Sequence, residues 1–216
     1  MLEKMDAFFA ARLGGYDVHM MKEIDGAEEF YPYTASLLPA ERGANVLDLG
    51  CGTGLELEFY FERNAQAFVT GIDLSREMLS ACAAKLKDRN LELVCASYFD
   101  VPLGTGRFDA AVSVESLHHF TAAEKLRLYK RLRAALKENG YFVLTDYFAQ
   151  SDEAEQVGFR ELEKLRNEQK LKENVLYHFD TPLTAEHEAE ILKNAGFRDV
   201  KLMKNWKATC TLLARR

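Results

Sequence analysis

The sequence predicts an α/β fold in which a doubly wound, mostly parallel sheet of seven strands includes an antiparallel C-terminal strand. Short apolar runs of strand length alternate with amphipathic stretches of helix length along most of the chain. The run at 45–49 ends abruptly in a glycine-rich turn, and a helical stretch follows it. The last two strand-like segments, 198–204 and 207–214, are joined too tightly for a helical crossover, so we expect them to pair antiparallel.

Residues 1–42 predict a set of short helices ahead of the first strand. Apolar side chains recur at helix spacing from Met5 to Leu13, a Gly-Gly pair interrupts them, and two further apolar sets follow. Ligands of doubly wound sheets bind at the carboxyl ends of the strands. We therefore expect 1–42 to form a helical cap over that edge, with a simple extension of the core as the alternative.

Residues 43–146 carry the regular alternation of strand and helix and form the expected cofactor-binding core. We expect strands at 45–49, 68–73, 91–96, 108–114 and 141–146, and helices at 55–64, 76–87 and 121–137. Ser75 is a good N-cap for the second of these helices. Thr121 and Glu124 form a capping box for the third, and the pair Asn139-Gly140 is typical of a helix C-terminus.

Beyond residue 146 the alternation stops. The charged segment 151–178 predicts a helical insertion without a strand, a second candidate to cover the site. Residues 184–216 then predict a helix from Thr184 to Gly196 and the antiparallel hairpin. A length of 216 residues without a linker or internal repeat suits one domain better than two cores, so we expect 1–216 to be a single domain.

Composition and charge exclude several classes of protein. With 48% hydrophobic and 29% charged residues, the chain is neither disordered nor fibrous. It has no apolar run of the roughly 18–20 residues that span a bilayer, and its N-terminus lacks the features of a signal peptide. We therefore expect a cytoplasmic protein without a membrane partner. A net charge of −6 disfavours nucleic acid as a partner, and the oligomeric state stays open, a homodimer included.

The cysteines give no sign of a metal site. Cys51, Cys82, Cys95 and Cys210 form no C-x-x-C pair, and no cluster of cysteine and histidine has the spacing of a zinc site. Reduced thiols are the simplest account, and we expect no bound metal. Cys51 lies inside the glycine-rich turn, where we expect it to be a small tolerated side chain rather than a nucleophile.

The glycine-rich turn reads GCGTG at 50–54 and predicts a nucleoside cofactor. Glycines let a backbone turn sharply and approach a ligand closely, and the helix N-terminus behind them favours negative charge. Nicotinamide dinucleotides and S-adenosylmethionine both use this arrangement. The dinucleotide fingerprint G-x-G-x-x-G would need its third glycine at Leu55, not at Gly54. Asp48, just before the turn, would repel a pyrophosphate, but it could orient the turn and attract the ammonium of a methionine moiety.

The nine residues 46–54, VLDLGCGTG, resemble motif I of the class I S-adenosylmethionine-dependent methyltransferases almost letter for letter. The similarity extends more loosely over 43–146 and over the terminal hairpin, whose antiparallel last strand is characteristic of that family. The segment LHH at 117–119 is similar to one common in its small-molecule branch. The resemblance implies a Rossmann-like fold, S-adenosylmethionine as cofactor, S-adenosylhomocysteine as product, and a small-molecule methyl acceptor.

The resemblance also implies which residues hold the cofactor. Asp73, at the end of the second strand, matches the acid that binds both ribose hydroxyls. Ser97 stands where the family usually has Asp, and it can still accept one hydrogen bond from the adenine amino group. Tyr16 begins a Tyr-Asp pair similar to one that caps the cofactor. The expected cofactor-binding set is Tyr16, Asp48, Gly50, Cys51, Gly52, Gly54, Asp73, Leu74, Met78, Ser97, Tyr98 and Glu115.

Three residues after the fourth strand are the catalytic candidates. Methyl transfer is an in-line displacement at a sulfonium methyl, and much of its acceleration comes from holding the nucleophile in line. A nearby base helps if the acceptor is a hydroxyl or a protonated amine. We expect His118, His119 and Glu115 to supply it, with His19 and His178 as further candidates. A histidine pair at a helix start is also often structural.

Three classes of function remain open from the sequence. A small-molecule methyltransferase accounts for most of the features. A nucleotide-dependent oxidoreductase of Rossmann type would also use an acid at Asp73, but the position of Gly54 and the terminal hairpin disfavour it. A non-catalytic nucleoside-binding protein would tolerate Ser97, whereas the intact motif and Asp73 favour a working cofactor site. Macromolecular acceptors such as tRNA stay open within the first class.

Overall fold

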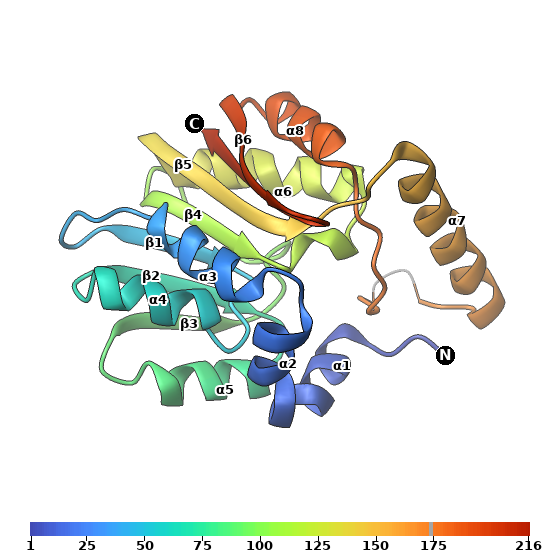
Figure 1. The fold of residues 1–216 in the computed structure, drawn as a ribbon, viewed down its shortest axis with the longest axis horizontal. Coiled ribbons are helices and arrows are strands. Elements are labelled where there is room, and N and C mark those ends of the chain that lie inside the picture. The colour runs from blue at the N-terminus through green and yellow to red at the C-terminus, as the bar shows by residue number, and fades with distance from the viewer. Residues whose placement is uncertain (173–174) are drawn as a thin grey trace.

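The computed structural model describes residues 1–172 and 175–216, which contain a seven-stranded sheet in the order β3-β2-β1-β4-β5-β7-β6 (Figure 1). The strands are β1 (Asn45–Leu49), β2 (Phe68–Asp73), β3 (Asn90–Cys95), β4 (Phe108–Val114), β5 (Leu136–Tyr147), β6 (Arg198–Trp206) and β7 (Thr209–Arg215). Strands β1 to β5 pair in parallel, and β7 pairs antiparallel with both β5 and β6. The predicted fold class and the predicted hairpin are therefore confirmed.

Side chains that alternate along the strands build one apolar layer on each face of the sheet. Val46 of β1 packs into one layer, whereas Leu47 and Leu49 pack into the other. Helices α3 (Ala27–Ser36), α4 (Leu55–Arg63) and α5 (Arg76–Lys85) cover the first face, and α6 (Ala122–Ala135) and α8 (Ala185–Asn194) cover the second (Figure 1). With both faces covered, the chain forms the layered sheet that a doubly wound fold requires.

The N-terminal residues form the predicted short helices. They are α1 (Met5–Arg12), the 3₁₀ turn η1 (Leu13–Gly15) and α2 (Tyr16–Glu23), with α3 after them. The predicted break at the Gly-Gly pair is the 3₁₀ turn. Residues of α1 and α2 line the cavities described below, so the predicted cap comprises these two helices and its role stays a prediction, while α3 packs on the sheet as part of the core.

The predicted helix N-termini are confirmed by their capping bonds. The Ser75 hydroxyl accepts from the Met78 N–H at 3.3 Å, and Thr121 and Glu124 form a reciprocal capping box. The Thr184 hydroxyl caps α8 in the same way. Each cap satisfies a backbone donor that the first turn of a helix leaves free.

The predicted end of the helix before β5 is wrong. We expected it to reach residue 137 and to stop at Asn139-Gly140, but α6 ends at Ala135. The N–H groups of Gly106 and Arg107 bind the carbonyls of the last two α6 residues at 2.9 and 2.7 Å. This contact caps the helix from a distant loop, so β5 begins at once with Leu136, which is fully buried.

The charged insertion forms helix α7 (Asp152–Gln169), which is shorter than the expected range of 151–178. It ends where Lys170 adopts a left-handed φ of 50°, and the expected part at 173–174 lies outside the described residues. None of the α7 residues is buried, and the helix projects from the body of the molecule (Figure 1). In the described part of the chain, no helix is both long and apolar enough to cross a membrane.

Residues 175–181, which we call the strap, run in extended form across the N-terminus. Tyr177 pairs with Lys4 in an antiparallel bridge, and the Met5 N–H donates to the Leu176 carbonyl at 3.0 Å. The strap therefore contacts the N-terminal segment through its backbone, and the last residue of α7 adds one bond, from the Leu2 N–H to the Gln169 side-chain oxygen at 2.7 Å.

A buried ion pair joins the two helices on the second face. Lys125 of α6 places its Nζ 2.5 Å from Glu188 Oε2 of α8, and the Tyr129 hydroxyl donates to the other oxygen of the same carboxylate. Both charged side chains are at most 2% exposed. Because a buried charge is costly without a partner, this pair fixes α8 against α6.

Candidate functional site

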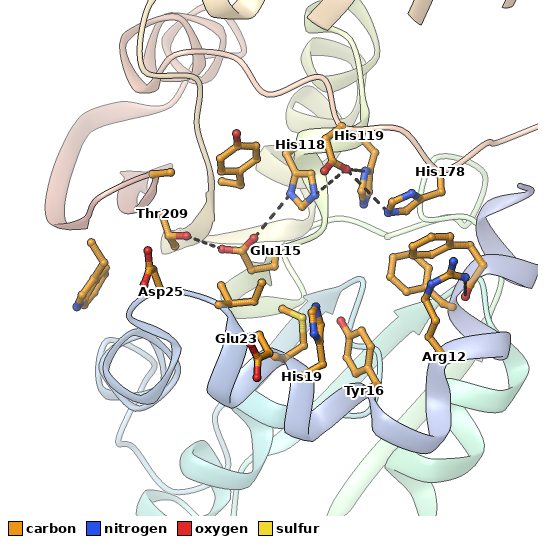
Figure 2. Close-up of a pocket in the computed structure, with 18 of the residues that line it drawn as sticks. Arg12, Tyr16, His19, Glu23, Asp25, Glu115, His118, His119, His178 and Thr209 are labelled. Carbon is orange, nitrogen blue, oxygen red and sulfur yellow. Dashed lines mark hydrogen bonds and ion pairs between the residues drawn. The ribbon is translucent and has the colours of Figure 1, made fainter. Parts of the chain in front are cut away.

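Two adjoining cavities lie where β1 and β4, the strands at which the sheet reverses its order, end. This is the place where doubly wound sheets bind ligands. The larger cavity has a volume of about 810 Å³ (Figure 2). The smaller one follows the glycine-rich turn and the end of β2. The two share four lining residues, Phe9, Tyr16, Glu115 and His119.

The glycine-rich turn approaches its neighbours too closely for side chains. Gly50 has a φ of +80°, and a Cβ there would lie 2.0 Å from the Ser116 Oγ. Gly54 has a φ of +77°, and a Cβ there would lie 2.8 Å from the Cys82 Sγ. Left-handed backbone and tight contact together require glycine at both positions. The turn therefore leaves a bare backbone edge toward the smaller cavity.

Asp73 is held by the turn itself. Its Oδ2 accepts from the Gly52 N–H at 2.9 Å, and its Oδ1 accepts from the Ser75 N–H at 2.8 Å. Burial raises the pKa of Asp73, while these backbone hydrogen bonds oppose the shift. Each oxygen keeps acceptor capacity for a ligand. The expected residues that line this cavity together are Tyr16, Gly50, Gly52, Asp73, Leu74, Met78, Ser97, Tyr98 and Glu115.

Three other expected cofactor residues lie outside the lining of both cavities: Asp48, Cys51 and Gly54. Asp48 is fully buried, and its carboxyl oxygens have no hydrogen-bond partner among the described residues. Burial and the neighbouring Glu56 carboxyl raise its pKa well above the usual value, which favours the neutral form. Cys51 is buried against Gly71. Asp48, Cys51 and Gly54 therefore belong to the packing around the turn. Direct contact of these residues with a cofactor stays a prediction.

The cap is tied to the glycine-rich turn through Asp17, a residue that the sequence analysis mentions only beside Tyr16. The Thr53 hydroxyl in the turn donates to Asp17 Oδ1 at 2.5 Å, and Lys85 Nζ donates to Asp17 Oδ2 at 2.6 Å. Asp17 thus links α2 to both the turn and α5. The neighbouring Tyr16 lines both cavities, so the wall between them depends on this link.

Glu115 has a strained backbone and lines both cavities. Its φ of 48° is left-handed, which is rare for a residue with a side chain. Its Oε1 accepts from the Thr209 hydroxyl at 2.9 Å. Burial and the nearby Asp146 carboxylate raise the pKa of Glu115 to about 7. A carboxyl group that can exchange a proton near neutral pH therefore faces the junction of the two cavities.

His118 is oriented by a buried carboxylate. Its Nδ1 lies 2.6 Å from Asp146 Oδ1, and Asp146 also accepts from the backbone N–H groups of Leu117 and Tyr147 at 2.9 Å. Burial alone would lower the pKa of His118, but Asp146 outweighs it and raises that pKa to about 9. Asp146 is not among the predicted site residues. An acid at the end of a central strand nevertheless indicates a ligand site, because doubly wound sheets bind ligands there.

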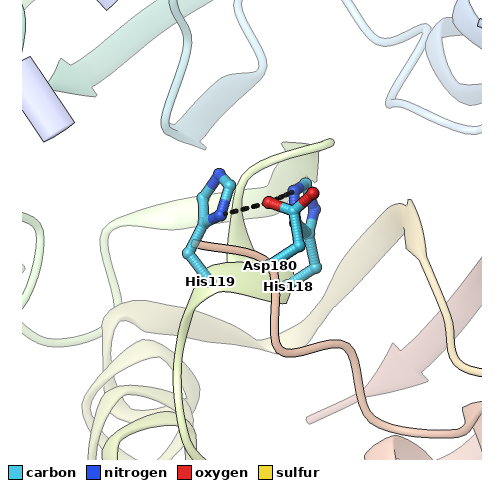
Figure 3. A group of neighbouring side chains, drawn as sticks. All are labelled: His118, His119 and Asp180. Atoms are coloured by element: carbon cyan, nitrogen blue, oxygen red, sulfur yellow. Dashed lines mark ion pairs between the residues drawn. The ribbon is translucent and has the colours of Figure 1, made fainter. Parts of the chain in front are cut away.

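His119 and the strap meet at Asp180. The Nδ1 of His119 lies 3.1 Å from Asp180 Oδ1, and the Nε2 of His118 lies 3.6 Å from the same oxygen (Figure 3). Burial and neighbouring His118 lower the pKa of His119 to about 4. His178 Nε2 faces the same oxygen at 3.9 Å. The structure therefore brings the predicted histidine pair together with Asp180, for which the sequence has no local signal.

The remaining histidine candidate lies apart from this group. His19 of α2 lines the larger cavity only, on the side of the cap, with Glu23 and Asp25 further along (Figure 2). Thr209 and Trp206 also line this cavity, and Trp206 packs against Gly26 beside Asp25. His19 is thus placed to contact a ligand of the larger cavity.

The chain resembles known methyltransferases in both sequence and structure. Residues 46–140 match the family model of a methyltransferase domain. A fatty-acid O-methyltransferase of Mycolicibacterium smegmatis is 30% identical over 118 residues, which are 55% of this chain and 42% of that protein. A carboxy-S-adenosyl-L-methionine synthase of Nautilia profundicola is 25% identical over 186 residues, which are 78% of this chain and 76% of that protein. The chain thus spans less than half the length of the first of these relatives.

Other relatives differ in what they modify. Some are named as tRNA and 18S rRNA methyltransferases. The solved structure of an S-adenosylmethionine dependent methyltransferase from Mesorhizobium loti superposes with a TM-score of 0.63 at 22% identity, covering 86% of this chain and 96% of that one. This likeness shows a shared fold, and the relatives together point to no single acceptor.

Proposed function

Because the chain belongs to the class I S-adenosylmethionine-dependent methyltransferase superfamily, we propose that it transfers a methyl group to a small molecule bound in the larger cavity. Membership implies S-adenosylmethionine as cofactor and S-adenosylhomocysteine as product. One observation supports the proposal above all. The cavity along the glycine-rich turn and the larger cavity share a wall, formed by Phe9, Tyr16, Glu115 and His119.

The residues that line the smaller cavity offer the groups that the cofactor needs, and the cavity, with a volume of about 50 Å³, has to widen for the cofactor to enter. The bare turn at Gly50 has no room for a Cβ and exposes backbone to a ligand. Asp73 has both oxygens fixed by the backbone and can accept from two ribose hydroxyls. Leu74 and Met78 offer apolar surface for the adenine, and Ser97 offers a hydrogen-bond acceptor. Glu115, which lines the same cavity and the larger one, would be available to the methionine part of the cofactor.

The larger cavity fits a small molecule in size and lining. Its volume of about 810 Å³ lies within the range of roughly 300–1,000 Å³ usual for small-molecule sites. Aromatic rings of Phe8, Tyr147 and Trp206 and the histidines line it. The net charge of −6 opposes binding to an RNA backbone. RNA remains the competing acceptor class because of the tRNA and rRNA relatives.

When bound, S-adenosylmethionine supplies an electrophilic methyl group on a sulfonium. The chain's part is to align the acceptor atom with that methyl group and to take the acceptor's proton where there is one. The shared wall holds three ionisable residues, Tyr16, Glu115 and His119, and burial raises the pKa of the Tyr16 phenol, which makes it a poor base. His118 lines only the larger cavity. We therefore assign proton transfer to Glu115 or His119, and a supporting position to His118.

Calorimetric titration with S-adenosylmethionine, S-adenosylhomocysteine and NADH tests the cofactor. We expect micromolar binding of the first two alone, and binding of NADH alone would overturn the proposal. Formation of S-adenosylhomocysteine is then measured with pools of small molecules and with total RNA. Turnover with RNA alone would replace the small-molecule acceptor by an RNA acceptor.

Two variants test the shared wall. We expect Glu115→Gln or His119→Gln to slow turnover of the cofactor-saturated protein about 100-fold or more, the usual contribution of a general base. Because Glu115 also belongs to the expected cofactor-binding set, the affinity for S-adenosylhomocysteine is measured for each variant so that saturation is assured. His187→Gln is the matched control, because His187 pairs with Glu155 on the surface, far from both cavities. If both wall variants turn over at the control rate, positioning alone accounts for catalysis.

A further inference from the structure

We propose that His118, His119 and Asp180 bind one divalent first-row transition-metal ion, with His178 as a further ligand. The four side chains come from two separate parts of the chain, the end of β4 and the strap (Figure 2). His118 Nε2, His119 Nδ1 and His178 Nε2 all face Asp180 Oδ1. This site goes beyond the proposed methyl transfer, and the spacing of cysteines and histidines gave no hint of it.

The distances within the group fit one ion. Two ligands at 2.0–2.2 Å from a tetrahedral ion lie about 3.3–3.6 Å apart. Asp180 Oδ1 lies 3.1 Å from His119 Nδ1 and 3.6 Å from His118 Nε2, and ligand atoms of all three residues lie within 4.8 Å of one another (Figure 3). His178 Nε2 lies 3.9 Å from Asp180 Oδ1, next to this group of three but not within it.

A buried carboxylate orients the first histidine as metal sites require. Metal-bound histidines almost always donate their other ring N–H to a carboxylate or a carbonyl, which fixes the tautomer. His118 Nδ1 lies 2.6 Å from Asp146 Oδ1, so the Nδ1 proton is held by Asp146 and Nε2 is the nitrogen that faces Asp180. A metal ion that binds at Nε2 displaces the proton of that nitrogen. Asp146 is itself held by two backbone N–H groups. The carboxylate that orients His118 is therefore fixed in place.

The strap is fixed at both ends of its ligand-bearing part. The His178 N–H donates to the Glu3 carbonyl at 3.0 Å, and the Thr181 N–H donates to the His118 carbonyl at 2.8 Å. The His178 ring stacks on Phe8, with ring centroids 3.5 Å apart and planes 7° from parallel. Because these ligands are already held in place, binding a metal ion costs less conformational entropy.

The donor set selects the class of ion. Three imidazole nitrogens and one carboxylate oxygen suit Zn²⁺, Fe²⁺, Co²⁺ or Ni²⁺, whereas Mg²⁺ and Ca²⁺ prefer oxygen ligands. All four side chains line the larger cavity. With His118, His119 and Asp180 alone as ligands of a tetrahedral ion, the fourth position would be open to the acceptor. An oxygen of the acceptor bound there would lose its proton more readily, and Glu115 rather than His119 would take that proton, because the ion occupies the basic nitrogen of His119.

The alternative is a set of ion pairs without a metal. His119 Nδ1 lies 3.3 Å from the Phe179 carbonyl as well as near Asp180, so its N–H could serve these two oxygens. In that case Asp180 is a hydrogen-bond acceptor only, and removing its charge would not affect affinity for a metal ion. The two accounts therefore differ in the effect of Asp180→Asn on metal binding.

Cobalt binding tests the site directly. The full chain is stripped with a chelator, desalted and titrated with Co²⁺ while the visible absorption is recorded, and Zn²⁺ is then added as a competitor. We expect one Co²⁺ per chain, displaced by one Zn²⁺. Asp180→Asn and His119→Gln should each weaken Co²⁺ binding by at least about 100-fold. Replacing a residue that only supports a metal ligand already lowers metal affinity by up to about 100-fold. His187→Gln, the surface histidine–carboxylate control, should bind as the wild type does.

Binding of S-adenosylhomocysteine shows that Asp180→Asn and His187→Gln are folded, because these residues lie outside the smaller cavity. For His119→Gln, whose residue lines that cavity, cooperative thermal unfolding shows that the fold is retained. If Asp180→Asn does not fold, His119→Gln and the zinc-dependent rise in the melting temperature of the wild type carry the test. No Co²⁺ binding by the wild type, or equal binding by wild type and a folded ligand variant, overturns the site. Either result leaves the proposed methyl transfer standing, since the cofactor titration measures that separately.

Discussion

Replacing Asp73 by asparagine tests the cofactor site at a single group. In the structure, one carboxylate oxygen accepts from the Gly52 N–H at 2.9 Å and the other from the Ser75 N–H at 2.8 Å. Asparagine has nearly the same size, but it offers one acceptor oxygen and one NH₂ donor. Whichever way the amide turns, one of the two backbone N–H groups then faces another donor.

The expected loss of affinity follows from these contacts. A hydrogen bond to a charged group contributes about 1.5–3 kcal/mol, and Asp73→Asn removes at least one such bond to the ribose. Since about 1.4 kcal/mol corresponds to a factor of ten, we expect the affinity for S-adenosylhomocysteine to fall by about ten- to a hundredfold. The unsatisfied N–H of the turn adds to this loss, because Gly52 lines the same cavity.

Calorimetric titration with S-adenosylhomocysteine measures the effect without turnover. Asp100→Asn is the matched control, because it makes the same chemical change at an exposed residue outside the smaller cavity. Thermal unfolding of each variant checks that the fold is retained. An Asp73→Asn affinity within twofold of the wild type would remove Asp73 from the ribose. An equal loss in Asp100→Asn would attribute the effect to overall charge.

Three further predictions concern the turn, a buried acid and a buried pair. Gly50→Ala places a Cβ 2.0 Å from the Ser116 Oγ, and we expect cofactor binding to be lost in calorimetry. Gly43→Ala, at a φ of +76° in open space, should cost only the backbone strain of about 1–2 kcal/mol. Burial raises the pKa of Asp48 above its usual 3.8, so the folded chain keeps a proton that the unfolded chain releases. The contribution of the Asp48 proton to the free energy of unfolding is fully present below about pH 4. It is lost as the pH rises toward the pKa of Asp48 in the folded chain, by up to about 1.4 kcal/mol per pH unit. Urea unfolding at several pH values should therefore show a flatter pH dependence for Asp48→Asn, and an unchanged slope would contradict this. Glu188→Gln leaves a buried ammonium without its partner, and urea unfolding should show a loss of about 3–5 kcal/mol; a loss below 1 kcal/mol would mean that water reaches the lysine.

The sequence predicted the sheet and the cofactor half of the site because their signals are local. The motif at 46–54 is contiguous, and Asp73 closes a strand whose register with β1 follows from the parallel pairing. The end of α6 could not be predicted from Asn139-Gly140, since a contact with the loop at 106–107 caps the helix. The residue patterns that predict a helix end involve only residues adjacent in sequence, whereas this cap comes from a loop far from the helix end in the chain.

The acceptor half depends on contacts between distant residues. Asp180 and His178 sit in an irregular segment, and only the fold places them beside His118 and His119. Spacing rules for metal sites detect ligands that are near one another in sequence, so they do not detect this group. Asp17 was visible beside Tyr16, but its bonds to the turn and to α5 require the tertiary structure.

The bonds of Asp17 have a consequence for the order of events in a catalytic cycle. The same short helix that is anchored to the glycine-rich turn also contributes Tyr16 to the wall of the acceptor cavity. A cofactor that settles on the turn therefore also sets the shape of the second cavity. We expect an ordered sequence in which the cofactor enters first and its demethylated form leaves last, with the acceptor admitted only in between.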